Sequence, residues 1–215
     1  MDFERVEVKG LVKIYGATRA LVGVDATFDA GEVTVIEGPN GSGKSTLLNI
    51  LGQLVRPTRG EVFYGQWTTA SASGIELRAL IGILAHAAMI YPDLSARENL
   101  ALYIELHGLP DAKATLEAAV ERFEIGRWGE RDARTYSRGQ LQRLALARAL
   151  IHSPRLLLLD EPSTGLDKRA VERLVLAVNK ERERGAIVVL ITHDPVLAER
   201  LADARFELSR GKVVS

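Results

Sequence analysis

The sequence predicts an α/β domain built around a mostly parallel β-sheet. Short apolar runs, bounded by glycine and acidic residues, alternate along the chain with segments of helical periodicity, which is typical of parallel strands joined by helices. These runs lack the alternation of polar and apolar residues, which indicates strands that are buried on both faces. The expected buried strands are Glu32–Ile36, Ile81–Ala85, Leu156–Leu159 and Ala186–Thr192.

The two ends of the chain predict antiparallel strand pairs instead. Val6–Ile14 and Leu21–Phe28 alternate more loosely on either side of a Tyr-Gly turn, and Arg205–Leu208 and Lys212–Val214 flank a Ser-Arg-Gly turn. Two runs joined by a short turn that contains glycine are typical of a β-hairpin. We therefore expect an antiparallel β subdomain at the N-terminus.

The middle of the chain, residues 93–152, has a helical pattern almost throughout. The expected helices are Leu100–His107, Ala112–Phe123 and Leu141–His152. No linker or internal repeat separates this segment from the rest, so we expect a single domain over residues 1–215. Its α/β core would comprise residues 1–92 and 153–215, and residues 93–152 would form an inserted helical subdomain.

Composition excludes several classes of function. The chain has 215 residues, with 28 Lys and Arg against 28 Asp and Glu, and no cysteine. A neutral chain lacks the uncompensated basic residues on which nonspecific nucleic-acid binding depends, so no nucleic-acid partner is expected. A chain without cysteine cannot form a disulfide, a thiolate zinc site, an iron–sulfur cluster or a cysteine nucleophile.

No stretch of the sequence suggests a membrane span or an export signal. The longest stretches without a charged residue, Val62–Ile75 and Ala79–Pro92, are shorter than the roughly 18 residues that a helical span needs. The chain starts with Met-Asp-Phe-Glu, whereas a secretory signal starts with basic residues before an apolar run. We expect a chain that is neither exported nor anchored by itself.

A glycine-rich segment after the first expected buried strand predicts a phosphate site. It fits the pattern G-x-x-x-x-G-K-[ST] and lies between a strand and a helical run, which favours a P-loop over a plain glycine-rich turn. Glycines let backbone N–H groups surround phosphate oxygens, the lysine adds a cation, and the hydroxyl after it can bind Mg²⁺. The segment consists of Gly38, Pro39, Asn40, Gly41, Ser42, Gly43, Lys44, Ser45 and Thr46.

Two acidic residues follow the four leucines of Leu156–Leu159. Asp160 and Glu161 stand at the carboxyl end of a buried parallel strand, where ligands of open α/β sheets bind. We expect Asp160 to hold Mg²⁺ through water and Glu161 to polarise the attacking water as general base. The alternative is that both acids only favour a helix start at Pro162. A nucleotide loop requires a magnesium partner, which favours the catalytic interpretation.

The segment that follows Tyr136 is similar to the signature of the ABC family. Ser137, Arg138, Gly139 and Gln140 stand shortly before the acidic pair and resemble the motif Leu-Ser-Gly-Gly-Gln. In that family the signature of one subunit caps the γ-phosphate of ATP bound to another, so the resemblance implies a second cassette, most simply in a homodimer. A serine at the head of a helix forms an anion site, while Ser-x-x-Gln is also a plain capping box.

Three further matches extend the resemblance along the chain. Tyr15 resembles the aromatic that stacks on adenine, Asp167 ends a segment similar to the loop that contacts the partner's nucleotide, and His193 resembles the switch histidine at the γ-phosphate. Each also has a structural interpretation, as a core tyrosine, a turn and a strand-terminal histidine. Together the matches imply catalysis by Glu161, His193 and Lys44, with ATP and Mg²⁺ bound.

Two positions depart from the family pattern. His86 stands where the family has a glutamine that binds Mg²⁺ together with the residues corresponding to Ser45 and Asp160. A neutral imidazole can accept that role, but a protonated one beside Mg²⁺ is unfavourable, so we hypothesise that coupling weakens as pH falls. Arg138 replaces a glycine, and it would either add charge toward the phosphate or project into solvent.

The resemblance implies the ATPase subunit of a transporter. Such a subunit is cytoplasmic and peripheral on the inner membrane, bound to a polytopic permease that would dock near His86–Leu94. Soluble ABC machines that act on nucleic acid typically have two cassettes or long insertions, which this sequence does not show; an ABC-type ATPase for cofactor assembly is the alternative. The short length, His86 and the Tyr-Ser-Arg-Gly signature look like the ATPase subunit of the haem exporter of cytochrome c maturation.

Overall fold

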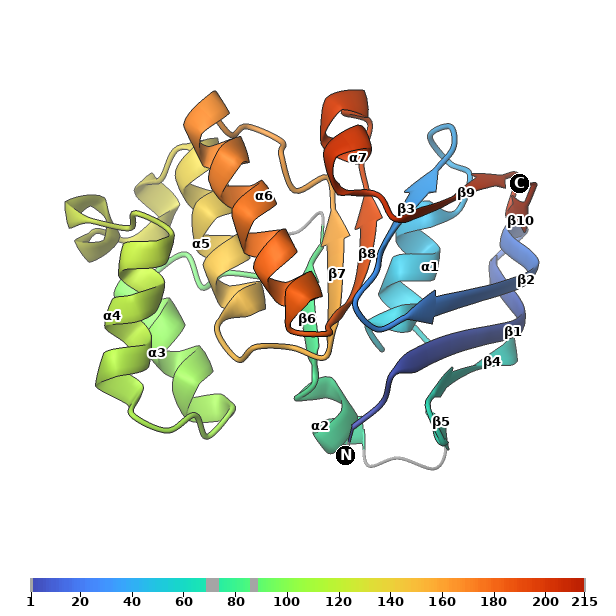
Figure 1. Cartoon of the computed structure of the whole chain (residues 1–215), viewed down its shortest axis with the longest axis horizontal. Helices are drawn as coiled ribbons and strands as arrows, with labels where there is room; N and C mark the ends of the chain where they lie inside the picture. The colour runs from blue at the N-terminus through green and yellow to red at the C-terminus, as the bar shows by residue number, and fades with distance from the viewer. Residues whose placement is uncertain (1, 69–73, 86–88, 215) are drawn as a thin grey trace.

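A computed structural model describes residues 2–68, 74–85 and 89–214, which form two sheets with helices packed on them (Figure 1). The smaller sheet is antiparallel and has four strands in the order β2-β1-β4-β5. This confirms the antiparallel N-terminal part, although the sequence pattern offered no expectation for its last two strands. Its strands are β1 (Arg5–Tyr15), β2 (Thr18–Asp29), β4 (Arg59–Tyr64) and β5 (Trp67–Thr68).

The larger sheet has six strands in the order β10-β9-β3-β8-β7-β6. The pairs β9–β3, β3–β8, β8–β7 and β7–β6 are parallel, whereas β9 and β10 are antiparallel. The predicted α/β fold with a mostly parallel sheet is therefore confirmed. The strands are β3 (Val33–Glu37), β6 (Ile81–Leu84), β7 (Leu156–Asp160), β8 (Ile187–Ile191), β9 (Ala204–Ser209) and β10 (Lys212–Val213).

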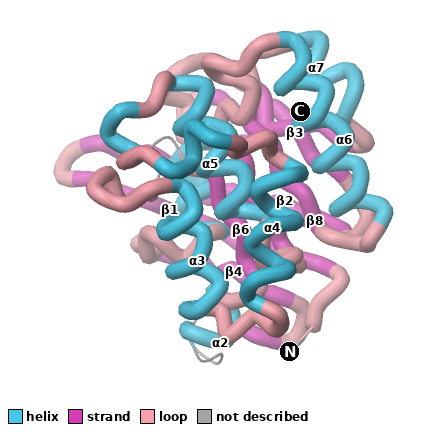
Figure 2. The backbone as a smooth tube through the Cα atoms, turned by 90° about the vertical axis from the view of Figure 1, so that its left-hand side faces the viewer, coloured by secondary structure: helices cyan, strands magenta, loops and turns pink. Residues whose placement is uncertain are grey.

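Helices cover both faces of the larger sheet. Figure 1 shows α1 on the side of the antiparallel sheet, and α5, α6 and α7 on the opposite side; in Figure 2, α3 and α4 lie outermost on the helical side. In the described ranges, no helix combines the length and the apolar character that a membrane crossing requires. The helices are α1 (Lys44–Leu51), α2 (Gly74–Arg78), α3 (Ala96–Leu106), α4 (Ala112–Arg122), α5 (Arg138–Leu150), α6 (Lys168–Glu183) and α7 (Pro195–Leu201), with 3₁₀ turns η1 (Arg127–Glu130) and η2 (Ala133–Thr135).

Two of the expected helices begin earlier than their apolar periodicity indicates. Helix α3 begins just after Ser95 and α5 just after Ser137, and each serine forms a complete capping box with the residue three positions later. A capping box satisfies backbone donors that a helix start leaves unpaired, so the polar first turn is helical as well. Helix α6 was not among the expected helices because its sequence is rich in charge, yet it buries the stripe Leu174, Val175, Ala177 and Val178.

Strand β7 divides two hydrophobic cores. Leu157 and Leu159 pack in the core that contains α5, α6 and α7, whereas Leu156 and Leu158 pack in the core that contains α1 and the antiparallel sheet. All four leucines have no exposed surface. Replacing any one with alanine would remove about 2–5 kcal/mol of stability. The strand therefore has a fixed position between the two layers.

A stacked pair of histidines lies beside the end of α5. The ring of His152 stacks on that of His107, with 4.3 Å between centroids and 23° between planes. The ring of Tyr103 also stacks on His107, with 5.3 Å between centroids. The pKa of His152 is lowered to about 3, mainly by burial, with the nearby His107 and Arg148 acting in the same direction. Burial, followed by Arg148, also lowers the pKa of His107. The folded protein thus resists protonation of His152.

We predict that the His152→Phe variant has a flatter dependence of stability on pH. Because the pKa of His152 is about 3 in the folded chain and that of an unperturbed histidine is 6.5, only the unfolded chain binds this proton between those values. Stability is therefore lost as pH falls from about 6.5, by up to about 1.4 kcal/mol per pH unit. Urea unfolding of both proteins from pH 7 to pH 4 measures the difference, and parallel curves would contradict the prediction.

Candidate nucleotide-binding site

The segment between β3 and α1 forms a tight loop that only glycine allows at several positions. Gly38, Gly41 and Gly43 have φ angles of 133°, 78° and 110°, in the region that favours glycine. A side chain on Gly38 would also collide with the carbonyl oxygen of Leu208 in β9. Helix α1 starts directly after this loop, and its first amide groups have no carbonyl partner within the helix. Together with the helix dipole, these amides make an anion site.

The C-terminal hairpin holds this loop in place. The amide of Gly211, in the β9–β10 turn, donates to the carbonyl of Ser42 at 2.9 Å, and the amide of Val22 in β2 donates to the carbonyl of Gly211 at 2.8 Å. The hydroxyl of Ser42 itself is buried and has no hydrogen-bond partner in the described structure. Since buried polar groups are almost always paired, this hydroxyl fits a site that a phosphate completes.

Lys44 lies over the loop with its ammonium group partly paired. Nζ donates to the carbonyls of Gly38 at 2.6 Å and Pro39 at 3.0 Å, and the residue is 7% exposed. Burial lowers the pKa of Lys44, whereas the charges of Glu161 and Asp160 act to raise it. An ammonium has three donors, so one remains for a phosphate oxygen.

The backbone just after the carboxyl end of β7 is strained and is held from two sides. Glu161 has a φ of 50°, which non-glycine residues adopt rarely, and its amide donates to the carbonyl of Ile191 at 2.9 Å. Gln142 in α5 donates from Nε2 to the carbonyls of Glu161 at 3.3 Å and Pro162 at 3.0 Å. Sequence reasoning missed Gln142. The available signal was a second polar glutamine directly before the part of α5 that is buried, which starts at Leu144.

The carboxylate of Glu161 meets His193 and the glycine-rich loop. Oε2 accepts from the backbone N–H of His193 at 3.2 Å, and Oε1 lies 3.7 Å from Nε2 of the same residue. Nε2 is also 3.0 Å from Oδ1 of Asn40. Oε1 is buried and has no hydrogen-bond partner within the described residues. A carboxylate oxygen that is free beside an imidazole can accept a proton from water.

These residues border one open cleft of about 470 Å³, a size within the usual range for small-molecule sites. Tyr15 borders it too, with 46% of its surface exposed, so the interpretation as a core tyrosine is wrong. The ammonium of Lys13 covers one face of its ring at 4.8 Å from the centroid. The predicted residues that line the cleft are Tyr15, Asn40, Gly41, Gly43, Lys44, Ser45, Thr46, Asp160, Glu161 and His193.

The cleft fits a metal only together with phosphate. Within the described residues, no group of three or more acidic, histidine or cysteine side chains could hold a metal ion. Ser45 and Asp160 offer a hydroxyl and a carboxylate oxygen at the same cleft, and Mg²⁺ is commonly bound by one or two protein oxygens plus substrate phosphates and water. The third predicted ligand, His86, lies outside the described residues.

The signature-like residues form a second surface that does not line the cleft. The capping box of α5 is present, since Oγ of Ser137 accepts from the amide of Gln140 at 3.3 Å and its own amide donates to Oε1 of Gln140 at 3.0 Å. A side chain on Gly139 would come within 2.8 Å of the Gly165 carbonyl oxygen. The aliphatic part of Arg138 lies next to Gly165, and the residue as a whole is exposed, in agreement with the predicted projection into solvent.

Asp167 ends the loop that contacts this surface and caps α6. Its Oδ1 accepts from the amide of Ala170 at 2.8 Å. Asp167 therefore has a structural role, as the alternative interpretation expected. Gly165, two positions earlier in the same loop, lies against Arg138 and Gly139 of the signature-like turn. The structure thus separates the predicted site residues into a cleft and a second surface formed by residues 137–140 and 165–167.

The parallel sheet, the loop that carries Lys44 and the acidic end of β7 define an ATPase of the P-loop class. The family model described as ABC transporter matches residues 21–164. The chain therefore belongs to the ABC transporter family.

Relatives of known role and solved structures agree with this assignment. The chain is 37% identical over 213 residues to the daunorubicin resistance ATP-binding protein DrrA3 of Streptomyces coeruleorubidus, covering 98% of this chain and 67% of the relative. It is 38% identical over 222 residues to the lipoprotein-releasing system ATP-binding protein LolD of Anaeromyxobacter dehalogenans, covering 98% and 92%. It spans only 34% of the pyoverdine export protein PvdT of Pseudomonas syringae, at 36% identity over 222 residues and 98% of this chain.

A dimeric ATP-binding cassette solved in a post-hydrolysis state with ADP and Pi has the same fold. It superposes with a TM-score of 0.89 at 31% sequence identity, covering 98% of this chain and 97% of that one.

We predict that Gln142→Leu slows ATP hydrolysis without weakening nucleotide binding. The substitution removes both donors that hold the carbonyls of Glu161 and Pro162, and a small displacement of a catalytic group costs roughly 10- to 100-fold in rate. Steady-state ATPase rates and nucleotide titration measure the two effects. The exposed Gln66→Leu is the matched control with an unchanged rate, and an unchanged rate in both variants would contradict this role of Gln142.

Proposed function

We propose that this chain is the ATP-hydrolysing subunit of a membrane transporter and acts with a second cassette and a separate permease. The observation that supports it best is the position of Glu161. Its buried, unpartnered Oε1 lies 3.7 Å from Nε2 of His193 and borders the same cleft as Lys44. This arrangement suits activation of a water next to a bound phosphate chain.

The glycine-rich loop and its surroundings would hold the nucleotide. The third donor of Lys44 and the first amides of α1 would bind phosphate oxygens. The free face of Tyr15 would stack on the base. Ser45 and Asp160 would hold Mg²⁺, which when bound neutralises phosphate charge; His86 remains a proposed third ligand.

Hydrolysis would then depend on Glu161 and His193. The Glu161 carboxylate takes a proton from water as the water oxygen bonds to the γ-phosphorus and the bond to the ADP oxygen breaks. His193 orients that water from Nε2, and Asn40 fixes the imidazole through the contact at 3.0 Å. The strained Glu161 backbone is consistent with this role, because strain of this kind clusters at functional sites.

A second cassette would complete the site. Ser137, Arg138, Gly139, Gln140 and Asp167 lie outside the cleft of their own chain, yet the head of α5 is an exposed anion-binding helix start. In a two-fold symmetric dimer the same surface of each chain faces the cleft of the other. The dimeric state of the similar cassette supports this arrangement.

The permease would bind near residues 89–94, on the cytoplasmic face of the membrane. Met89 is 42% and Tyr91 54% exposed, which leaves apolar surface available there. The names of DrrA3, PvdT and LolD as parts of resistance, export and release systems support a transporter subunit. Because the chain is neutral, no nucleic-acid partner is proposed.

Haem is the substrate that we propose for the transporter, exported for cytochrome c maturation. The support is His86 and the signature around Ser137. The relatives carry different cargo in their names, from daunorubicin to lipoproteins and hemin, so the cassette itself gives little information on cargo. An ABC-type ATPase for cofactor assembly is the competing function.

Glu161→Gln should bind ATP normally but hydrolyse it roughly 10²–10⁴-fold more slowly, because it removes the general base. The variant should also accumulate as an ATP-bound dimer, visible by size-exclusion chromatography with light scattering. The exposed Glu199→Gln is the matched control with a normal rate. Hydrolysis by Glu161→Gln at the normal rate would remove Glu161 from this role.

Mixing two inactive variants should restore activity if sites are shared between chains. Lys44→Ala loses the phosphate ligand of its own cleft, and Ser137→Glu places a repelling carboxylate in the cleft of its partner. In the mixed dimer one cleft is intact, so an equal mixture should recover about a quarter of the normal activity. No recovery, despite mixed dimers detected by native mass spectrometry, would contradict the shared site.

The transporter assignment predicts a membrane partner. Coexpressed with the polytopic protein of a neighbouring reading frame, the chain should copurify with it in detergent, and haem should raise the ATPase rate of the complex in vesicles. Copurification with a soluble assembly factor instead would favour the competing function. A membrane complex whose rate does not respond to haem would contradict only the cargo.

A further inference from the structure

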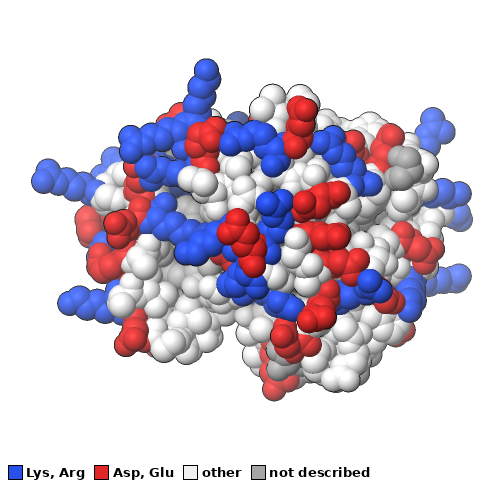
Figure 3. Space-filling view, in the orientation of Figure 1, with Lys and Arg blue, Asp and Glu red and all other residues white. Residues whose placement is uncertain are grey.

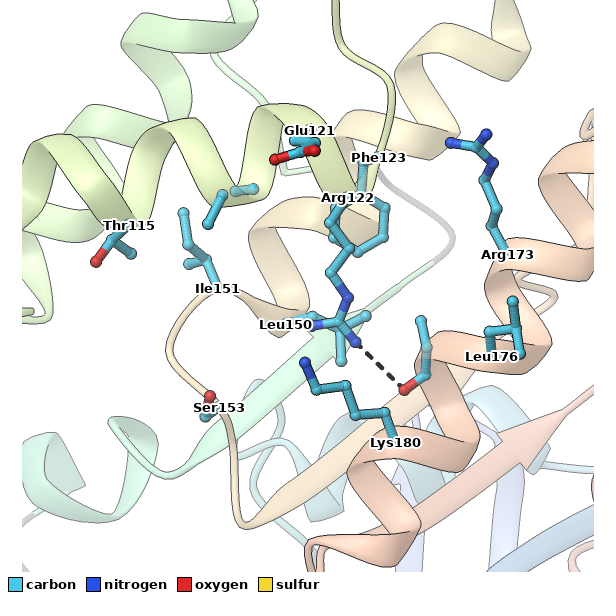
Figure 4. Close-up of a pocket in the computed structure, with 13 residues that line it drawn as sticks. Thr115, Glu121, Arg122, Phe123, Leu150, Ile151, Ser153, Arg173, Leu176 and Lys180 are labelled. Atoms are coloured by element: carbon cyan, nitrogen blue, oxygen red, sulfur yellow. Dashed lines mark hydrogen bonds between the residues drawn. The ribbon is translucent and has the colours of Figure 1, made fainter.

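A second cavity lies between the helical segment and the α/β core, far along the chain from the nucleotide loop. It has a volume of about 600 Å³ and opens between α4, α5 and α6 (Figure 4). Its walls include the apolar side chains Ala118, Ala119, Phe123, Leu150, Ile151, Leu176 and Ala177. Such a combination of size and apolar lining is usual for sites of small organic ligands.

The polar lining of this cavity is mainly cationic. Arg122, Arg173 and Lys180 line it together with a single acidic residue, Glu121. Figure 4 shows Arg122 from α4 and Lys180 from α6 reaching toward one another across the cavity. In Figure 3, Lys and Arg side chains gather over α6. The cavity therefore combines an apolar wall with a cluster of positively charged side chains.

The nearby carboxylates do not neutralise this charge. Glu181 is 2% exposed and is shared between Arg122 at 3.3 Å and Arg184 at 2.8 Å. Glu124 is likewise shared among three arginines, namely Arg143, Arg169 and Arg173. In the part of the chain that the structure describes, the ammonium of Lys180 forms no ion pair. Cations thus outnumber carboxylates, and an anion at this place would gain electrostatic energy.

The cavity also lies where the polypeptide passes from the helical segment into the core. Ile151 and Ser153 belong to the connection between α5 and β7, and Ser153 has a φ of 51°. Arg122 on the helical side donates to the carbonyl of Ala177 in α6 at 3.4 Å. A ligand seated here would contact both parts at once.

We propose that this cavity binds a small organic anion with an apolar body and thereby bridges α4 to α6. A carboxylate or phosphate head would pair with Arg122 and Lys180, while the body would cover Leu150, Ile151 and Leu176. An inorganic anion lacks the apolar part of this recognition, and an uncharged amphiphile lacks the ionic part. The site is separate from the nucleotide cleft, because the two share no lining residue.

Octanoate is the test probe. Octan-1-ol is the matched ligand without the charge, and acetate is the matched ligand without the long alkyl chain. Titration of the full chain by NMR should show that octanoate binds at least about fivefold more tightly than either. Lys180→Gln should weaken octanoate binding at least about fivefold, since it removes one charged partner, while the exposed Lys212→Gln in β10 should leave it unchanged. Leu176→Asp, which puts a carboxylate at the apolar wall, should abolish it.

Two further measurements locate the bound probe. Lys44→Ala should bind octanoate as tightly as the unmodified chain, because the nucleotide loop is not involved. Amide hydrogen exchange of residues 151–153 and of Arg155 should slow when octanoate is present, because the probe covers that connection. Three results would each overturn the proposal. They are equal binding of octanoate and octan-1-ol, a loss of octanoate binding in Lys44→Ala as large as in Lys180→Gln, and unchanged octanoate binding in Lys180→Gln and Leu176→Asp.

Discussion

The burial of β7 on both faces is the constraint on which the rest of the structure depends. Its four leucines have no exposed surface and belong alternately to two cores, so the strand cannot shift by one residue without exchanging the two sets. Its parallel neighbours, β6 and β8, fix its position laterally. Asp160 and Glu161 are therefore delivered to one place at the edge of the sheet. Apolar packing thus determines the geometry of the acidic pair, although neither acid takes part in that packing.

Much of this arrangement could be predicted because the relevant rules are local. Parallel strands bring their carboxyl ends to one edge, which placed Asp160 and Glu161 at the ligand side of the sheet, and Lys44, Glu161 and His193 border one cleft there. The features that could not be predicted depend on contacts distant in sequence. The left-handed backbone of Glu161 exists because Ile191 and Gln142 hold it, and no periodicity encodes that. Similarly, β4 forms by pairing with β1 rather than from a pattern of its own.

The site residues fall into two sets with different physical character. The cleft is built by tight backbone turns, buried polar atoms and a lysine whose pKa is lowered by burial. The second surface is an exposed helix start, Ser137–Gln140, whose capping box already satisfies its own serine and glutamine. The first set lines a cleft of its own chain, whereas the second is a preformed helix start that lies outside that cleft. The two interpretations of Ser137 are therefore compatible, because a capped helix start is also a rigid one.

The contact between the nucleotide loop and the C-terminal hairpin has a consequence for biosynthesis. Gly38 lies against the carbonyl of Leu208, and Ser42 accepts from the amide of Gly211, so a loop near the beginning of the chain is completed by residues near its end. A ribosome releases the chain from its N-terminus at roughly 5–20 residues per second. The loop must then wait about eight seconds or more, at the faster of these rates, for the hairpin that closes it. Nucleotide binding by a nascent chain would consequently wait until Gly211 has emerged, and a product that stops before this hairpin would not occupy ATP.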